Sequence, residues 1–172
     1  YTLATVELVE QLSMSRLEPS RLYYASGSRG TQAGLTLGAK ACNAPYRLHG
    51  VAVSTGEPEK TQRAFNAANV AAELLGISTR VTYDDLFTDN AFIGEGYGIP
   101  TPECLEAIAL LARTEGILLD PCYTGKAMAG LIAHVRSGEL PPDDTVVFLH
   151  TGGAPGMFTR EFAELFSETV LT

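Results

Sequence analysis

Cysteine is scarce in this sequence, which contains only Cys42, Cys104 and Cys122. The three are odd in number and widely spaced, and they form neither a CxxC pair nor a cluster with histidine. This pattern speaks against a disulfide framework and against a zinc site, so no metal is expected and the thiols are interpreted as small packing residues. A reducing, cytoplasmic environment is the simplest compartment for such a chain.

Basic side chains are also few, because 12 Lys and Arg face 20 Asp and Glu and give a net charge of −8. Such a charge repels a phosphate backbone, so nucleic acid is not expected as a partner. No apolar run approaches the roughly 20 residues that cross a bilayer, and the acidic start of the chain is unlike a basic signal peptide. A soluble protein that does not bind membranes is therefore expected.

The 172 residues, 45% of them hydrophobic, are enough for one substantial core. Candidate strands and helices alternate along the chain. The expected strands are 21–25, 46–53, 79–83 and 145–150, and helices are expected at the start of the chain and over 31–42, 57–75, 102–113, 124–137 and 160–166. Because the strands lack polar alternation, this order predicts an α/β fold, with a three-layer open, mostly parallel sheet and helices on both faces.

A glycine-rich turn, residues 26–31 (SGSRGT), connects the first expected strand to a helix. Glycines allow successive backbone N–H groups to converge, and the helix amino terminus adds about half a positive charge, so the turn is suited to a phosphate. The spacing is neither that of a Walker loop nor that of a GxGxxG fingerprint. A tight turn without a ligand is the alternative interpretation.

Two tyrosines lie in segments that make them candidates for chemistry. Tyr97 is flanked by glycines in the long loop 87–101, and a loop of that length inside a compact domain is typical of functional segments. Tyr123 precedes a helix within residues 119–126 (LDPCYTGK). A phenol can transfer a proton when its pKa is tuned. Loop packing by Tyr97 and helix capping by Thr124 are the alternatives.

Residues 150–155 (HTGGAP) follow the last expected strand. Ligands of open parallel sheets bind at the carboxyl ends of the strands, so the Thr151 hydroxyl and the 26–31 turn are expected to face the same crevice. His150 is a candidate general base. Neither a nucleophile nor a metal partner accompanies it, however, which favours a structural hydrogen bond.

Four segments together resemble the D-cysteine desulfhydrase and aminocyclopropanecarboxylate deaminase family, in the same order and at matching intervals. They are SGSRGTQAGL, GEGYGIPTPE, LLDPCYTGKAMAGLI and FLHTGGAPGMF. The resemblance covers about residues 23–158. It implies a fold-type II enzyme of the tryptophan synthase β-like class, with pyridoxal 5′-phosphate as its cofactor and a homodimer as its assembly.

The resemblance also implies roles for particular residues. Thr151 would hydrogen-bond the pyridine nitrogen of the cofactor, and Tyr97 and Tyr123 would face the substrate and act in proton transfer or positioning. Five consecutive residues of the turn would hold the cofactor phosphate: Gly27, Ser28, Arg29, Gly30 and Thr31.

Two positions favour the desulfhydrase branch of this family. The deaminases resemble DPxYEGK and HLGG at the two late segments, whereas this chain has Thr124 and Thr151. A neutral hydroxyl at the pyridine nitrogen favours its unprotonated form, which suits β-elimination better than chemistry that needs a stronger electron sink. The expected enzyme is a carbon–sulfur lyase that converts D-cysteine, or a related β-substituted amino acid, to pyruvate, ammonia and sulfide.

The chain departs from the family in two ways. Arg29 stands where the family usually has a small residue, so it would add charge to the phosphate or crowd it. The family's Schiff-base lysine and its smaller domain precede the matched segments, and residues 1–172 are expected to be only the carboxy-terminal part of the cofactor-binding large domain. Lys40 and Lys60 fall on expected surface helices and Lys126 lies in the helix after Tyr123, so none is nominated for the covalent bond.

The isolated chain is accordingly expected to be inactive. Its expected partners are a small amino-acid substrate, the missing amino-terminal segment of the same protein and a second subunit. Two alternatives stay open. One is an aminocyclopropanecarboxylate deaminase, and the other is a non-catalytic remnant that binds phosphate or dimerises.

Overall fold

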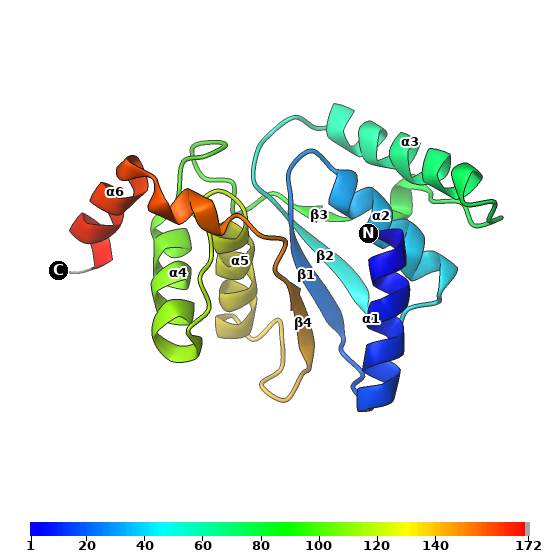
Figure 1. Ribbon diagram of the computed structural model, residues 1–172, viewed down its shortest axis with the longest axis horizontal. Helices are drawn as coiled ribbons and strands as arrows, with labels where there is room; N and C mark the ends of the chain where they lie inside the picture. The colour runs from blue at the N-terminus through cyan, green and yellow to red at the C-terminus, as the bar shows by residue number, and fades with distance from the viewer. Residues whose placement is uncertain (171–172) are drawn as a thin grey trace.

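The computed structural model describes the backbone of residues 1–170 and the side chains of residues 1–165. Helices and strands alternate along the chain, which runs from blue to red in Figure 1. The strands are β1 (Arg21–Ser26), β2 (Arg47–Ala52), β3 (Thr88–Asp89) and β4 (Val146–Leu149), and the helices are α1 (Thr2–Ser15), α2 (Gly30–Ala41), α3 (Glu59–Leu74), α4 (Pro102–Glu115), α5 (Thr124–Arg136) and α6 (Arg160–Val170).

The four strands form one parallel sheet in the order β3-β2-β1-β4. From β1 the chain moves outward to β2 and β3, and it then returns to the opposite side of β1 as β4. The strand order therefore reverses between β1 and β4. In open parallel sheets the carboxyl end of such a reversal is where ligands bind, and these ends lie at the top of the sheet in Figure 1.

The sheet is the middle of three layers. Leu22 and Tyr24 of β1 pack on one side against α1 and α2, and Tyr23 and Ala25 pack on the other side against α5. Helix α3 covers α2 from outside, and α4 covers α5, as Figure 1 shows. The predicted α/β architecture with helices on both faces is thus confirmed. Among the described residues, no helix is both long and apolar enough to cross a bilayer.

Helix α4 begins and ends at the residues that local conformational preferences predict. The side chain of Thr101 accepts a hydrogen bond from the backbone N–H of Cys104, and Pro102 occupies the first helical position of α4. At the other end Gly116 adopts the left-handed conformation with φ of 68°. These signals fix the direction in which the long loop enters α4.

The strand predicted over 79–83 is wrong. The backbone N–H of Val81 donates to Asn69 Oδ1 (3.0 Å), and Asn69 Nδ2 donates to the carbonyl of Val81 (3.0 Å). The amide of Asn69 thus satisfies both backbone groups that a neighbouring strand would have paired. The third strand instead follows the short η1 helix (Tyr83–Asp85) and is limited to Thr88–Asp89.

Candidate active site

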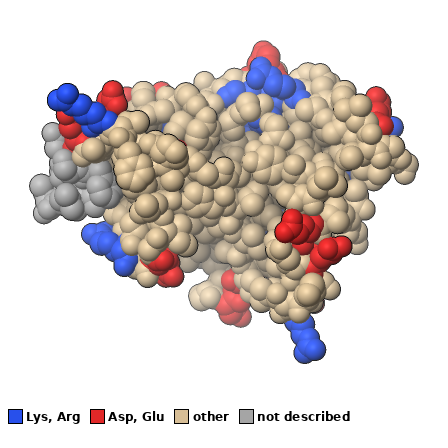
Figure 2. All heavy atoms as spheres, in the orientation of Figure 1, with Lys and Arg blue, Asp and Glu red and all other residues tan. Residues whose placement is uncertain are grey.

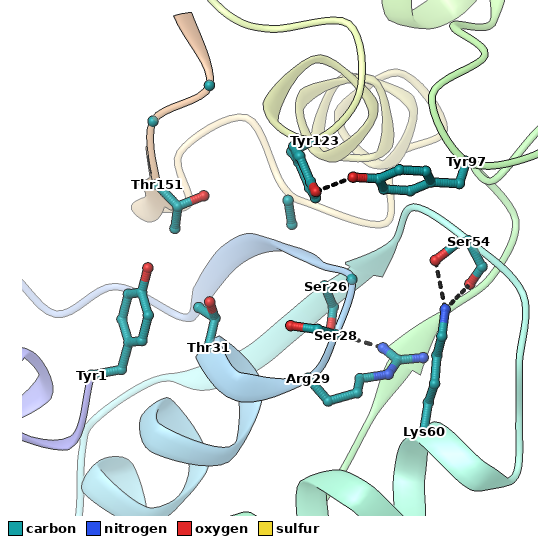
Figure 3. A pocket seen from close by; sticks show the side chains of 14 residues that line it. Tyr1, Ser26, Ser28, Arg29, Thr31, Ser54, Lys60, Tyr97, Tyr123 and Thr151 are labelled. Carbon is teal, nitrogen blue, oxygen red and sulfur yellow. Dashed lines mark hydrogen bonds between the residues drawn. The ribbon is translucent and has the colours of Figure 1, made fainter. Parts of the chain in front are cut away.

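A cavity of about 460 Å³ opens at the carboxyl edge of the sheet. Its walls come from segments far apart in sequence, namely the turn after β1, the loops after β2 and β4, the loop before α4 and the start of α5 (Figure 3). Seven of the eight predicted site residues line it: Gly27, Ser28, Arg29, Thr31, Tyr97, Tyr123 and Thr151. The structure therefore brings the glycine-rich turn and Thr151 to one cavity, and Gly30 lies next to it as the first residue of α2.

The turn between β1 and α2 presents unpaired hydrogen-bond donors at a helix amino terminus. Helix α2 begins at Gly30 without a side-chain cap, so the N–H groups of its first turn have no partner from the helix itself. The hydroxyls of Ser28 and Thr31 lie beside this end of the helix in Figure 3, and neither has a hydrogen-bond partner within the described chain. Unpaired backbone and hydroxyl donors at a helix amino terminus fit a phosphate.

Gly27 keeps the turn close to the opposite wall. A Cβ added at this position would lie 3.3 Å from Cε1 of Tyr123 and 3.4 Å from Cγ2 of Val53. Tyr123 would have to move by a few tenths of an ångström to admit it. The glycine therefore sets the distance between the anion site and the aromatic ring at the start of α5.

Arg29 belongs to the turn through its backbone, which is left-handed with φ of 77°. Its side chain is only 1% exposed and forms an ion pair with the carboxylate of Glu57. Nη1 also donates to Ser26 Oγ (2.8 Å) and to Thr88 Oγ1 (3.0 Å). The guanidinium is thus buried beneath the turn and paired with Glu57, while the backbone of Arg29 stays part of the turn.

Tyr97 and Tyr123 meet over the cavity, where their hydroxyls form a hydrogen bond (Figure 3). This bond, a further one with the Cys122 thiol and partial burial raise the pKa of Tyr97 above its ordinary value. Tyr97 is therefore a weaker acid than an ordinary phenol, so loss of its proton is disfavoured. The two tyrosines come from two segments, 87–101 and 119–126, each of which the sequence analysis identified separately as a candidate for chemistry.

The capping role considered for Thr124 belongs instead to Asp120. The Asp120 carboxylate, 2% exposed, accepts hydrogen bonds from the backbone N–H groups of Cys122, Tyr123 and Thr124 at 2.8–2.9 Å. Thr124 is fully buried, and its hydroxyl donates to Asp120 Oδ1 (2.7 Å). Four hydrogen bonds to one carboxylate thus fix the backbone that carries Tyr123.

The loop after β4 is held against the same carboxylate. Gly153 has φ of 97°, and a Cβ added to it would lie 2.5 Å from Cγ and Oδ1 of Asp120. His150 anchors the loop from the other side, because its Nε2 lies 2.8 Å from the Leu118 carbonyl and its Nδ1 accepts from the Gly152 N–H (3.2 Å). These bonds agree with the structural interpretation of His150, and they place Thr151 at the cavity.

Lys126 holds the loop that carries Tyr97. Its ammonium is fully buried and donates to the carbonyls of Ile93 (2.6 Å) and Gly96 (2.7 Å). Burial lowers the pKa of Lys126 below its ordinary value. Lys126 therefore connects α5 to the backbone of the long loop.

Lys60 and Tyr1 are among the cavity residues that the sequence analysis did not nominate. Lys60 was expected on a helix surface, but its ammonium turns inward and donates to the Ser54 hydroxyl (2.5 Å) and carbonyl (3.2 Å). Burial and the nearby Arg29 lower the pKa of Lys60. Lys60 follows β2 in the sequence, and the carboxyl ends of parallel strands are where ligands bind. This position could have identified Lys60 as a cavity residue. In Figure 2 the middle of the face is largely uncharged; acidic side chains lie to its right, and most other charged side chains lie nearer the rim.

Two comparisons with known proteins bear on the family of this chain. The chain matches a protein family described as "Pyridoxal-phosphate dependent enzyme" over residues 1–152. It is also similar to a crystal structure of an ACC deaminase homologue, with 34% sequence identity and a TM-score of 0.83 over 98% of this chain. The match covers 50% of that protein, so the chain spans about half of its length.

Proposed function

Because this chain belongs to the pyridoxal-phosphate dependent enzyme family and has its fold-type II architecture, we propose that it forms part of a carbon–sulfur lyase. The proposed substrate is D-cysteine or a related β-substituted amino acid. Elimination of sulfide followed by addition of one water would yield pyruvate, ammonia and hydrogen sulfide. The cofactor is pyridoxal 5′-phosphate, which when bound acts as an electron sink that makes the α-proton of an amino acid acidic.

The observation that carries this proposal is that the anion-binding turn and Thr151 line the same cavity. In the proposed arrangement the N–H groups of residues 27–31 and the hydroxyls of Ser28 and Thr31 hold the phosphate. The Thr151 hydroxyl would meet the ring nitrogen across the cavity. A neutral hydroxyl there favours the unprotonated nitrogen, which supports elimination chemistry.

Of the two positions at which this chain differs from the deaminases, Thr151 bears on the cavity and Thr124 does not. Thr124 is fully buried and bonded to Asp120, so its difference from the deaminase glutamate concerns the packing of this helix start. Thr151 is exposed and lines the cavity. The deaminase remains the second candidate, because the similar solved structure is that of an ACC deaminase homologue.

A product assay on the natural full-length protein tests the choice between these activities. We expect pyruvate and sulfide from D-cysteine, and no four-carbon keto acid from aminocyclopropanecarboxylate. Residues 1–172 alone should form neither product, since we propose that the cofactor-bonding lysine and a second subunit lie outside them. Deaminase activity without sulfide release would refute the lyase. Absence of both activities in a protein loaded with cofactor would favour a non-catalytic role.

Replacing Tyr123 by phenylalanine is expected to lower turnover of the full-length protein at least about tenfold, with unchanged cofactor content. The variant loses the hydroxyl that bonds Tyr97 at the cavity but keeps the ring that faces Gly27. Steady-state rates and cofactor absorbance measure the two effects. Tyr83→Phe is the matched control, because the Tyr83 hydroxyl bonds Gln62 outside the cavity. Equal rates for the two variants would remove Tyr123 from the proposed chemistry.

A further inference from the structure

Three potential metal ligands meet on the face of the sheet that α5 covers. They are His49 of β2, Asp89 of β3 and His134 in the last turn of α5. One ligand atom from each lies within 4.8 Å of the others. None of the three lines the cavity at the carboxyl edge, so this cluster is separate from the candidate active site.

The spacing of these atoms matches tetrahedral coordination. Nε2 of His49 and Nε2 of His134 each lie 3.4 Å from the same oxygen, Oδ2 of Asp89. This is longer than a usual N–H···O hydrogen bond of about 2.9–3.0 Å. Ligands bound tetrahedrally at about 2.0–2.1 Å from an ion lie about 3.3–3.4 Å from one another. Two of the three ligand spacings therefore already match those around a bound ion.

The surroundings orient the two imidazoles for this role. The Tyr23 hydroxyl lies 2.9 Å from Nδ1 of His134, which leaves Nε2 of that ring directed at Asp89. Such an outer hydrogen bond is the usual support of a metal-binding histidine. The ring of Phe87 packs against His49, with centroids 5.0 Å apart, and the ring of Phe92 packs against His134, with centroids 5.7 Å apart, so aromatic rings cover part of the cluster.

A further carboxylate, that of Glu139, lies at the edge of the cluster, where its Oε1 is paired with Arg21 at 2.6 Å. Oε2 of Glu139 lies 3.7 Å from Nε2 of His134. His49 and Glu139 also line a second cavity of about 560 Å³, which gives an ion or a water molecule access from solvent. The side chains of His49, His134 and Asp89 are only 9–14% exposed, so bound metal would be largely enclosed.

We propose that His49, Asp89 and His134 bind one divalent transition-metal ion of the class that prefers imidazole and carboxylate, with Zn²⁺ as its representative. The ion would connect β2, β3 and α5, and it would stabilise the fold rather than take part in the reaction. The sequence predicted no metal site because it contains no cysteine–histidine cluster. The ligands are separated by 40 residues between His49 and Asp89 and come together only in the folded sheet.

Equilibrium dialysis of the chelator-treated chain against Zn²⁺ tests this site. We expect one ion per chain, a higher melting temperature in its presence, and the intense visible absorption of tetrahedral Co²⁺ when cobalt replaces zinc. Asp89→Asn and His134→Gln should each weaken binding at least about tenfold, and Tyr23→Phe should weaken it less. His150→Gln is the matched control, since His150 is the third histidine of the chain and lies outside the cluster.

Several outcomes would overturn the proposal. One is the absence of zinc binding by the folded wild-type chain, and another is wild-type affinity in Asp89→Asn, which preserves side-chain volume. A thiolate-to-cobalt charge-transfer band would place the metal at a cysteine instead. Circular dichroism of each variant shows whether it folds. If His134→Gln does not fold, the Asp89→Asn and Tyr23→Phe affinities decide the question.

Discussion

A Gly153→Ala variant is expected to lose about 2–4 kcal/mol of unfolding free energy, measured by urea denaturation of the chain. Two effects add. The left-handed backbone, with φ of 97°, is strained for alanine, and the new methyl group would lie 2.5 Å from the Asp120 carboxylate. Since that carboxylate holds the start of α5, its displacement would also release Tyr123 and lower the affinity for the cofactor.

Gly152→Ala separates these two effects. Gly152 has a similar φ, 102°, but a Cβ there would meet nothing within 4 Å. We expect this variant to lose only about 1 kcal/mol, from backbone strain alone. If the two alanine variants are equally stable, contact with Asp120 is not what requires glycine at position 153.

Lys126→Met is expected to lower turnover of the full-length protein about 100-fold and to destabilise the chain by about 2 kcal/mol. The variant removes the donor of the Ile93 and Gly96 carbonyls, so the loop is no longer held where Tyr97 meets Tyr123. Part of the lost hydrogen bonding is offset, because a buried ammonium no longer has to be desolvated. Hydrogen exchange of residues 93–101 should become faster in the variant.

Lys40→Met is the control for this substitution. The Lys40 ammonium pairs with Asp85 at 2.6 Å, but the pair is partly exposed and lies outside the cavity. Its loss should change stability by less than about 1 kcal/mol and leave turnover unaltered. Unchanged loop exchange and turnover in Lys126→Met would show that the loop is positioned by its other contacts.

Features that depend on neighbouring residues could be predicted from the sequence. The cap at Thr101, the end of α4 at Gly116 and the turn at residues 26–31 each follow from the conformational preferences of the residues in place. The parallel order of the sheet follows from the alternation of strands and helices. This order also correctly predicted that Thr151 and the turn would share a crevice.

Features that depend on long-range partners could not be predicted. The segment around Val81 has strand-like residues, yet the side chain of Asn69 from α3 satisfies its backbone. The burial of Arg29 depends on Glu57 and Thr88. None of these pairings has a spacing that a sequence pattern would reveal.

Strand β4 forms one border of the sheet, and it pairs only with β1 among the described residues. Its four residues, VVFL, are all apolar and all partly accessible, and they include no charge or proline to prevent edge-to-edge pairing. At high concentration the isolated chain should therefore self-associate along this border. The elution volume of residues 1–172 in size-exclusion chromatography should therefore fall as the protein concentration rises.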